Sequence, residues 1–472
     1  MSREDDQITE KKGGLNGLGF TGAGLFPGGA MSRREFLKKA GIAGAAVGVG
    51  GSLSGFLSAC GGSNVAANGK PIIKILGTMA LSGGSAALGP PYNRAVGMAV
   101  DEMNAAGIPG FGGIDYTVDD DKSQPSVLMK SLQRAMQVLH PDMSIGCALE
   151  TEIRIPCALC PGFKLPEIVG GHLSMTKYMP PGEVPLTKWV CYYGYSDYFC
   201  GYLAGEFFAK NGVKKVAYVA GDYDWGYSNG IGLKSFWEQN GKPFEISPVI
   251  YTPLDQTDYS VQALAVKNAH PDAVYCVYMG AGWFSFPKQL RDANGMPKYF
   301  LYDPTYSNLG GAMVTGAYGA ENIYTLADHD PSSSAWADFV NKWKGKFGQN
   351  AYPEAYTNNH YQATYWFIEA CKKAGAKGLT DHNALIDAMH ETSFQNACIS
   401  PMGPLGVDGD NIGAMAAIIQ FQKGAGPLQP SFPLHDVLIE KKATPKKTAQ
   451  QVLDIMKGIP KLNQGQTYPA AS

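Results

Sequence analysis

The chain has 472 residues, of which 45% are hydrophobic and 17% are charged, so it has enough apolar material for one large or two ordinary globular domains. This composition excludes a chain that is disordered as a whole. Lys and Arg number 39 against 41 Asp and Glu, and the formal charge of -2 lacks the basic excess that a nucleic-acid-binding surface requires. We therefore expect small molecules or proteins as partners. The 59 glycines and 30 prolines indicate many turns rather than a long helical bundle.

The first 59 residues have the features of an export signal. Residues 1–30 are polar and Gly-rich without helical or strand periodicity. We therefore expect either a disordered extension or a start position assigned too far upstream, with Met31 as the alternative first residue. In residues 31–59, Arg33 and Arg34 stand shortly before a weakly apolar run. This arrangement resembles a twin-arginine signal peptide, which implies export in the folded state by the twin-arginine translocase.

The apolar run ends at Leu57, Ser58 and Ala59, directly before Cys60. Small residues before a cysteine resemble the cleavage box of a lipoprotein, which would make Cys60 the lipid-bearing residue and residues 60–70 a tether. An ordinary cleavage site beside an incidental cysteine is the alternative. An uncleaved anchor is disfavoured because the run is short and Gly-rich for a span of about 20 apolar residues. We expect an exported protein at the periplasm or cell surface, anchored to the membrane by lipid.

Eight further cysteines follow, an even number that permits disulfides in an oxidising compartment. Cys157 and Cys160 form a C-x-x-C pair, but no second such pair and no His pair at ligand spacing accompanies it. A structural disulfide or buried thiols are favoured over redox or zinc chemistry, and the pairing stays open. The eight are Cys147, Cys157, Cys160, Cys191, Cys200, Cys276, Cys371 and Cys398.

From residue 71 onward, short apolar strands alternate with segments whose apolar residues recur every three or four positions. This alternation is typical of an α/β protein with parallel sheets, and its repetition predicts two similar halves in one chain. Strands are predicted at 72–77, 114–118, 143–146, 167–169, 215–220, 245–251, 273–278 and 414–422. Helices are predicted at 95–103, 128–139, 198–210, 233–240, 260–268, 335–347, 361–373 and 385–390.

A set of short strings is spread over nearly all of residues 71–440, each of them weak alone but specific in order and spacing. They lie at 81–83, 99–107, 119–121, 145–146, 165–168, 196–197, 222–226, 257–260, 271–274 and 361–363. One of these strings is Asp222-Tyr223-Asp224-Trp225-Gly226. Together, the strings make the chain resemble a type I periplasmic solute-binding protein of the branched-chain amino acid group. Such proteins are the extracytoplasmic receptors of ABC importers.

The resemblance implies an α/β fold of two Rossmann-like lobes joined by a hinge of three crossings, with a ligand held between them. Lobe one would comprise 71–190 plus 326–400, lobe two 191–325 plus 401–440, and residues 441–472 would form a C-terminal tail. Turn-rich stretches near 180–185, 328–334 and 400–413 lie where a hinge would cross. Because ligands in open α/β sheets bind beyond the carboxyl ends of strands, the loops after strands are the candidate site.

In lobe one, Ser82 and Gly83 follow the first strand and offer a hydroxyl and open backbone N–H groups, although a plain helix cap is an equal alternative. Glu150 and Thr151 follow the third strand, where the family usually places a hydroxyl residue that holds a ligand carboxylate. A glutamate there would repel that carboxylate and favour a ligand with hydrogen-bond donors. The resemblance also places Gly171 and His172 at the site, against the alternative that this histidine is structural.

In lobe two, Tyr223 and Trp225 follow the strand at 215–220, and Trp283 follows the strand at 273–278. Family members that bind amino acids tend to place an acid in the second of these loops, and this chain has none there; Asp303 or Glu150 could substitute. The aromatic residues offer stacking area, although aromatic residues are often core. These departures favour an amide or an aromatic ligand over leucine, isoleucine or valine.

The function predicted from the resemblance is the capture of a small organic ligand, an amino acid, an amide or an aromatic compound, between two closing lobes for import. ABC permease subunits are the expected membrane partners, and no catalytic residue, metal or cofactor is expected. A sensor of the same fold that passes its ligand state to a regulator is the alternative. An exported redox enzyme built on Cys157 and Cys160 is the least favoured class.

The acidic residues 119–121 lack the spacing of a calcium loop, so we expect them to cap the next helix.

Overall fold

In the computed structural model, residues 64–472 form one compact unit, and the fold below is that of this unit. The structure describes residues 65–83, 85–86, 88–146, 150–170, 187–277, 282, 284–306, 309–395, 397–398, 402–411, 413–423, 434–443 and 447–471. The predicted signal residues Arg33 and Arg34 and the lipidation residue Cys60 lie outside the described part.

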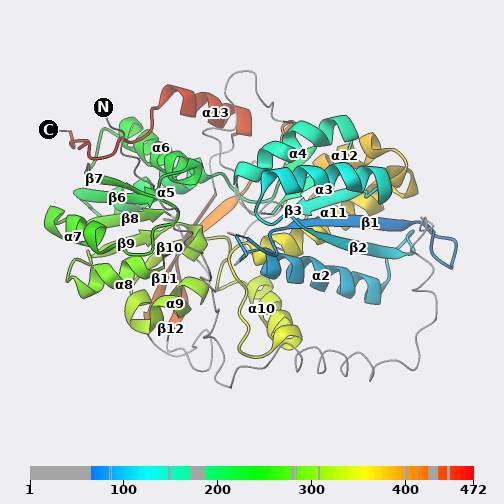
Figure 1. The fold of residues 1–472 in the computed structure, drawn as a ribbon, viewed down its shortest axis with the longest axis horizontal. Coiled ribbons are helices and arrows are strands. Elements are labelled where there is room, and N and C mark those ends of the chain that lie inside the picture. Colours follow the sequence, from blue (N-terminus) through cyan, green and yellow to red (C-terminus); the bar gives the residue numbers. More distant parts are fainter. Residues whose placement is uncertain are drawn as a thin grey trace, which may run out of the picture. The chain divides into compact units, whose positions relative to one another are not determined.

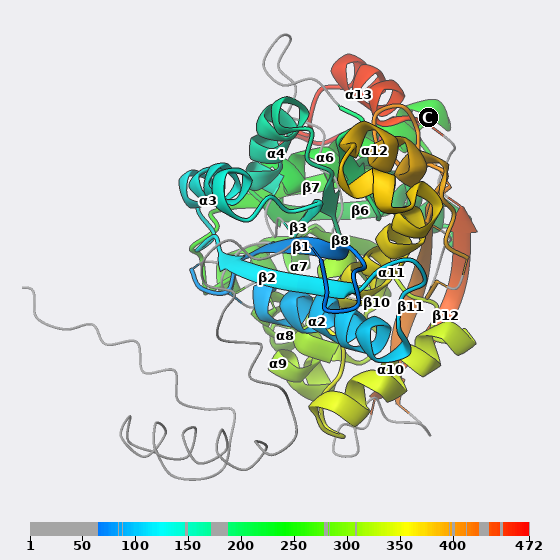
Figure 2. The ribbon, with the colours of Figure 1, turned by 90° about the vertical axis from the view of Figure 1, so that its right-hand side faces the viewer.

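The first sheet contains five parallel strands in the order β2-β1-β3-β4-β5. Its strands are β1 (Ile72–Met79), β2 (Gly113–Asp120), β3 (Met143–Gly146), β4 (Glu167–Val169) and β5 (Val190–Tyr192). They alternate with helices α2 (Gly89–Ala106), α3 (Pro125–Val138) and α4 (Glu150–Phe163). Figure 1 and Figure 2 show α2 on one face of this sheet and α3 and α4 on the other. Since both faces are covered, β1 is apolar along most of its length rather than alternating.

The second sheet contains seven strands in the order β12-β11-β10-β9-β8-β6-β7. The five strands from β7 to β10 in this order are parallel, and β11 and β12 add an antiparallel edge. The strands are β6 (Lys215–Gly221), β7 (Glu245–Thr252), β8 (Ala273–Val277), β9 (Tyr299–Tyr302), β10 (Tyr324–Ala327), β11 (Met415–Lys423) and β12 (Leu434–Ala443). Its helices are α5 (Asp197–Lys210), α6 (Asp224–Gln239), α7 (Ser260–Ala269), α8 (Ser285–Asp292) and α9 (Leu309–Ala320).

Successive residues of β6 point to opposite faces of the second sheet and enter different cores. Val216 and Tyr218 pack with apolar residues of α5 and α6, whereas Ala217 and Val219 pack with residues of α7 and α8. This arrangement explains why β6 reads as a continuous apolar run in the sequence: both of its faces are buried.

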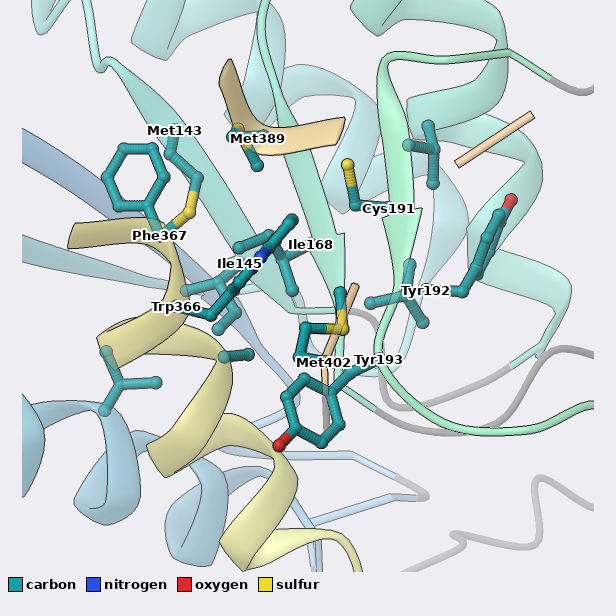
Figure 3. Packing of buried hydrophobic residues seen from close by; sticks show 14 of the residues in the cluster. Met143, Ile145, Ile168, Cys191, Tyr192, Tyr193, Trp366, Phe367, Met389 and Met402 are labelled. Carbon is teal, nitrogen blue, oxygen red and sulfur yellow. The ribbon is translucent and has the colours of Figure 1, made fainter. Parts of the chain in front are cut away.

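Three later helices return to the core of the first sheet. They are α10 (Ser334–Phe347), α11 (Thr357–Ala374) and α12 (His382–Glu391). Figure 3 shows Trp366 and Phe367 of α11 and Met389 of α12 packed with Ile145 of β3 and Ile168 of β4. Residues far apart in sequence therefore build one core, while the predicted lobes and their boundaries stay a prediction.

The last described segment contains helix α13 (Ala449–Gly458) and, after it, a stretch that pairs with the edge of β7. The helix begins with a capping box formed by Thr448 and Gln451. Beyond it, Tyr468 and Ile246 exchange backbone hydrogen bonds of 2.9 and 3.0 Å in an antiparallel bridge. The Gly465 N–H donates to the Val249 carbonyl at 2.9 Å, so this segment continues the ladder beyond the edge strand. The C-terminal segment thus belongs to the folded body.

The predicted α/β class with two parallel-dominated sheets is confirmed, and each predicted strand and helix has a counterpart. One expectation, the capping by residues 119–121, was wrong, and two features were not foreseen. Helix α4 was not predicted, because Pro156 and Pro161 lie within it and proline usually ends a helix. The late strand at 414–422 is β11, but it pairs antiparallel with both neighbours. Residues 119–121 do not cap α3, whose N-cap Gln124 has no side-chain hydrogen bond.

Among the helices that the structure describes, none combines the length and the apolar character that a membrane crossing needs.

Candidate ligand-binding site

Five of the predicted site residues lie outside the described part of the structure, either entirely or with their side chains. Gly171, His172 and Trp283 lie outside the described residues. Glu150 and Thr151 form the first turn of α4, but their side chains lie outside the described part. Whether these residues contact a ligand stays a prediction.

Ser82 and Gly83 follow β1 as predicted, but their described contacts are with the turn after β2. The Ser82 hydroxyl donates to Asp120 at 2.7 Å and its N–H donates to the same carboxylate at 3.1 Å. Gly83 has a φ of +88°, and a Cβ there would lie 2.2 Å from the Lys122 carbonyl oxygen. This close approach requires glycine and ties the two loops together. The Ser82 hydroxyl is thus already engaged within the protein.

Trp225 and Asp303 form a buried pair at the carboxyl ends of β6 and β9. The Trp225 indole N–H donates to Asp303 Oδ2 at 2.6 Å, and the indole is 2% exposed. The Thr305 N–H and hydroxyl both donate to Asp303 Oδ1, the N–H at 3.0 Å. The carboxylate therefore holds the indole in one orientation. Tyr223, also predicted at the site, is the half-buried N-cap residue of α6.

Tyr356 connects this pair to the first core. It is the buried N-cap residue of α11 and has a left-handed φ of 61°. Its N–H donates to Asp328 Oδ2 at 2.8 Å. Burial, and then the nearby Asp303 carboxylate, raise the pKa of the Tyr356 phenol, and the Tyr92 phenol of α2 acts in the same direction. The Tyr356 side chain therefore lies near groups from both sheets.

His360 lies one turn further along α11. Its ring stacks on Tyr92, with centroids 4.0 Å apart and planes inclined by 15°. Its Nδ1 bonds to the Tyr356 carbonyl oxygen at 2.9 Å. A Cβ at Gly170, directly after β4, would lie 2.6–2.7 Å from the His360 ring, so only glycine fits there. Burial lowers the pKa of His360 to about 4, so the imidazole is neutral near pH 7.

We call Tyr92, Trp225, Asp303, Tyr356 and His360 the Tyr356 cluster. It joins the ends of β4, β6 and β9 with the starts of α2 and α11. Sequence reasoning predicted Trp225 and Asp303 but missed the other three. One signal was available: residues 357–360 read Thr-Asn-Asn-His, and all four are buried, which is unusual for a polar run in a helix.

A second buried histidine stands where the chain passes from β10 to α10. His329 lies between Asp328, at 3.4 Å from Nδ1, and Asp436 of β12, at 3.2 Å from Nε2. Its ring stacks on Trp336 with centroids 3.9 Å apart. Burial acts to lower the pKa of His329, but the hydrogen bonds with Asp328 and Asp436 outweigh it and raise the pKa to about 9. This histidine is therefore a cation near pH 7.

The described cysteines do not support redox chemistry. All seven are free and buried, including Cys157 and Cys160, and Cys147 lies outside the described residues. Burial raises the pKa of the Cys157 thiol to about 11 and that of Cys160 well above its usual range, so neither is a ready thiolate nucleophile. Within the described ranges, no three His, Cys, Asp or Glu side chains come together as a metal site.

Three solved structures illustrate the similarity of the fold. A solute-binding protein of an ABC transporter from Rhodopseudomonas palustris BisB5, in complex with 3,4-dihydroxybenzoic acid, has 21% identity and a TM-score of 0.66, covering 80% of this chain and 99% of its own. A solute-binding protein of R. palustris in complex with benzoate has 18% identity and a TM-score of 0.66, covering 81% and 99%.

The third is the substrate-binding protein of a branched-chain amino acid transporter from Streptococcus pneumoniae in complex with isoleucine, with 19% identity, a TM-score of 0.63 and coverage of 79% and 99%. No match to this chain is found among curated proteins. Residues 72–425 match the family described as periplasmic binding protein, which is well over half of the chain. The chain therefore belongs to the periplasmic binding protein family.

Proposed function

We propose that this protein is the extracytoplasmic solute receptor of an ABC importer, which binds a small organic ligand between two lobes built on the two sheets. The membership in the periplasmic binding protein family over residues 72–425 carries this proposal. The Tyr356 cluster supports it, since the cluster gathers groups from the ends of strands in both sheets, where α/β proteins bind ligands.

We propose an aromatic or amide ligand rather than an aliphatic amino acid. Both oxygens of Asp303 accept hydrogen bonds from Trp225 and Thr305, so an ammonium group would have to share this carboxylate with donors of the protein itself. The cluster instead offers the rings of Tyr92, Trp225 and Tyr356. The R. palustris relatives of similar fold, whose complexes contain benzoate and 3,4-dihydroxybenzoic acid, agree with this class.

Isothermal titration calorimetry tests the ligand class. We expect the exported protein to bind at least one of benzoate, benzamide and 3,4-dihydroxybenzoate with micromolar affinity, and to bind leucine, isoleucine and valine at least tenfold more weakly. Micromolar binding of leucine or valine with no binding of the aromatic compounds would overturn the ligand class. Uptake of the labelled ligand by cells with and without the gene separates an importer from a sensor.

We propose that the lobes are 71–190 plus 326–400 and 191–325 plus 401–440, and that they separate to admit the ligand. Trp225, Tyr356 and His360 are at most 5% exposed, so a ligand reaches them only if the groups around them move apart. Small-angle scattering checks this: the radius of gyration should fall when the ligand binds. An equal radius in both states would contradict a hinge.

We propose that residues 31–59 direct export through the twin-arginine translocase and that Cys60 carries the lipid anchor. Replacing Arg33 and Arg34 by Lys should leave the precursor in the cytoplasm. Cys60→Ser should move the exported protein from the detergent phase to the aqueous phase in a partition assay. Retention of Cys60→Ser in the detergent phase would show that the anchor lies elsewhere.

A further inference from the structure

Within the described part of the chain, the His360 side chain has one nitrogen with a hydrogen-bond partner and one without. Nδ1 bonds to the Tyr356 carbonyl oxygen at 2.9 Å. A carbonyl oxygen can only accept, so Nδ1 carries the proton and Nε2 carries a lone pair. Nε2 is buried and has no hydrogen-bond partner among the described residues. Buried polar atoms in native proteins nearly always have a partner, which can be a ligand or an ordered water.

The protonation state of His360 defines what this partner must be. Since burial lowers its pKa to about 4, the ring takes up no second proton near pH 7. Nε2 is therefore a hydrogen-bond acceptor only, and its missing partner is an O–H or N–H donor.

The place of Nε2 in the fold points to a ligand. One face of the ring is covered by Tyr92, and the ring also lies against Gly170, which directly follows β4. One turn earlier on α11, the Thr357 hydroxyl is also buried without a partner among the described residues. Residues three apart share a helix face, so the two groups face the same region.

Resting on the proposed function, we propose that His360 Nε2 is a ligand-binding atom that accepts a hydrogen bond from the ligand, and that the ligand is an aromatic compound with a ring hydroxyl or amino group. Tyr92 and Tyr356 are buried aromatic residues of the same core cluster as this helix, a surrounding suited to a flat ring. The His360 Nε2 acceptor then discriminates between an aromatic ring with a hydroxyl or amino group and a ring without one.

Calorimetry with matched benzoates tests the proposal. The probes are 3-hydroxybenzoate, 4-hydroxybenzoate, 3,4-dihydroxybenzoate and 4-aminobenzoate, with 4-methylbenzoate as a ring of similar size without a donor. The wild-type protein should bind the best donor-bearing probe about tenfold more tightly than 4-methylbenzoate, as expected for one additional buried hydrogen bond. The hydroxyl and amino probes show which donor is accepted.

Two variants assign the preference to His360. His360→Phe keeps a ring against Tyr92 and should reduce the preference to about twofold or less. The Tyr356 carbonyl keeps a partner in this variant, because the backbone N–H of residue 360 donates to it at 3.2 Å. His360→Gln restores an acceptor and should restore part of the preference. His390→Phe is the control, since His390 is a half-buried residue that bonds to the Lys188 carbonyl at 2.8 Å.

A measurement without substitution covers the case in which His360→Phe does not fold. The imidazole ¹⁵N resonance of Nε2 should move upfield when a donor-bearing probe binds and should not move with 4-methylbenzoate. An unchanged preference in His360→Phe, or equal wild-type affinity for all probes, would overturn the inference and leave the proposed function intact. Binding of leucine with no binding of any benzoate would overturn the inference together with the proposed ligand class.

Discussion

His329 and His360 have the same side chain, the same complete burial and the same stacking on an aromatic ring, yet they carry different charges. His329 lies between two carboxylates, Asp328 and Asp436, and its pKa is raised to about 9. Among the described residues, His360 has a backbone carbonyl as its one side-chain hydrogen-bond partner, and its pKa is lowered to about 4. Burial acts on both in the same direction, so the carboxylates alone account for the difference.

This comparison separates a structural histidine from a candidate ligand-binding one. Both nitrogens of His329 have partners, and the cation joins the β10–α10 passage to β12 at the edge of the second sheet. His360 leaves one nitrogen without a partner in the described structure. A buried histidine with one spare acceptor is therefore the more informative of the two for function.

The largest effect is expected for His329→Leu. This substitution leaves Asp328 and Asp436 without the cation between them, and removing one partner of a buried ion pair costs about 3–5 kcal/mol of unfolding free energy. Urea unfolding at pH 6 measures the loss. His390→Leu, a half-buried control, should cost clearly less, and equal losses in the two variants would show that His329 acts only by its volume.

The stabilisation by His329 should also depend on pH. Its pKa is about 9 in the folded protein and near 6.5 in the unfolded chain, so the folded state holds the proton more tightly. The stabilisation is complete below pH 6.5 and is lost as the pH rises through 9, by about 3 kcal/mol in total. The difference in unfolding free energy between wild type and His329→Leu should shrink over this range; a constant difference would contradict the charged state.

His360 should show the opposite dependence in an acidic range. Its pKa is about 4 in the folded protein and near 6.5 in the unfolded chain, so the unfolded state binds the extra proton first. Stability is retained above pH 6.5 and falls as the pH drops toward 4, again by about 3 kcal/mol. His360→Phe should lose less stability than wild type between pH 6.5 and 4. Parallel profiles would show that His360 is not held neutral.

The smallest effect is expected for Tyr92→Leu. The stacked pair of Tyr92 and His360 contributes about 1 kcal/mol beyond the area that it buries, so unfolding free energy and affinity for an aromatic ligand should each fall by about that amount. Tyr318→Leu is the control, because Tyr318 is an exposed tyrosine that should tolerate the change. An unchanged affinity in Tyr92→Leu would place the ligand away from this pair.

The sequence predicted the fold well where the local pattern is strong. The strands at 215–220 and 273–278 are long apolar runs buried on both faces, and they correspond to β6 and β8. Strand β5 has only three residues, and its pairing with β4 depends on the whole sheet rather than on its own sequence. Helix α13 carried a readable capping box at Thr448 and Gln451 that the prediction of a plain tail did not use.

The candidate site was harder to predict. Asp303 and Trp225 could be proposed because they follow strands, but their mutual hydrogen bond needed the structure. His360 lies inside a helix, where a polar residue normally faces solvent, and its partner Tyr92 is far away in the sequence. Only the packing of α11 on α2 reveals that this residue is buried beside the end of β4.

The C-terminal segment that bonds to β7 has a consequence for solubility. A sheet edge with free N–H and carbonyl groups is a template for pairing with another chain. At β7, residues around Gly465 and Tyr468 occupy those groups, and they lie beyond residue 425, where the family match ends. At the opposite edge, β12 presents charged residues including Glu440, Lys441 and Lys442. The C-terminal backbone thus pairs with one edge of the sheet, and charged side chains disfavour pairing with another chain at the opposite edge. A chain shortened before residue 463 would expose the unpaired edge of β7 and should aggregate more readily.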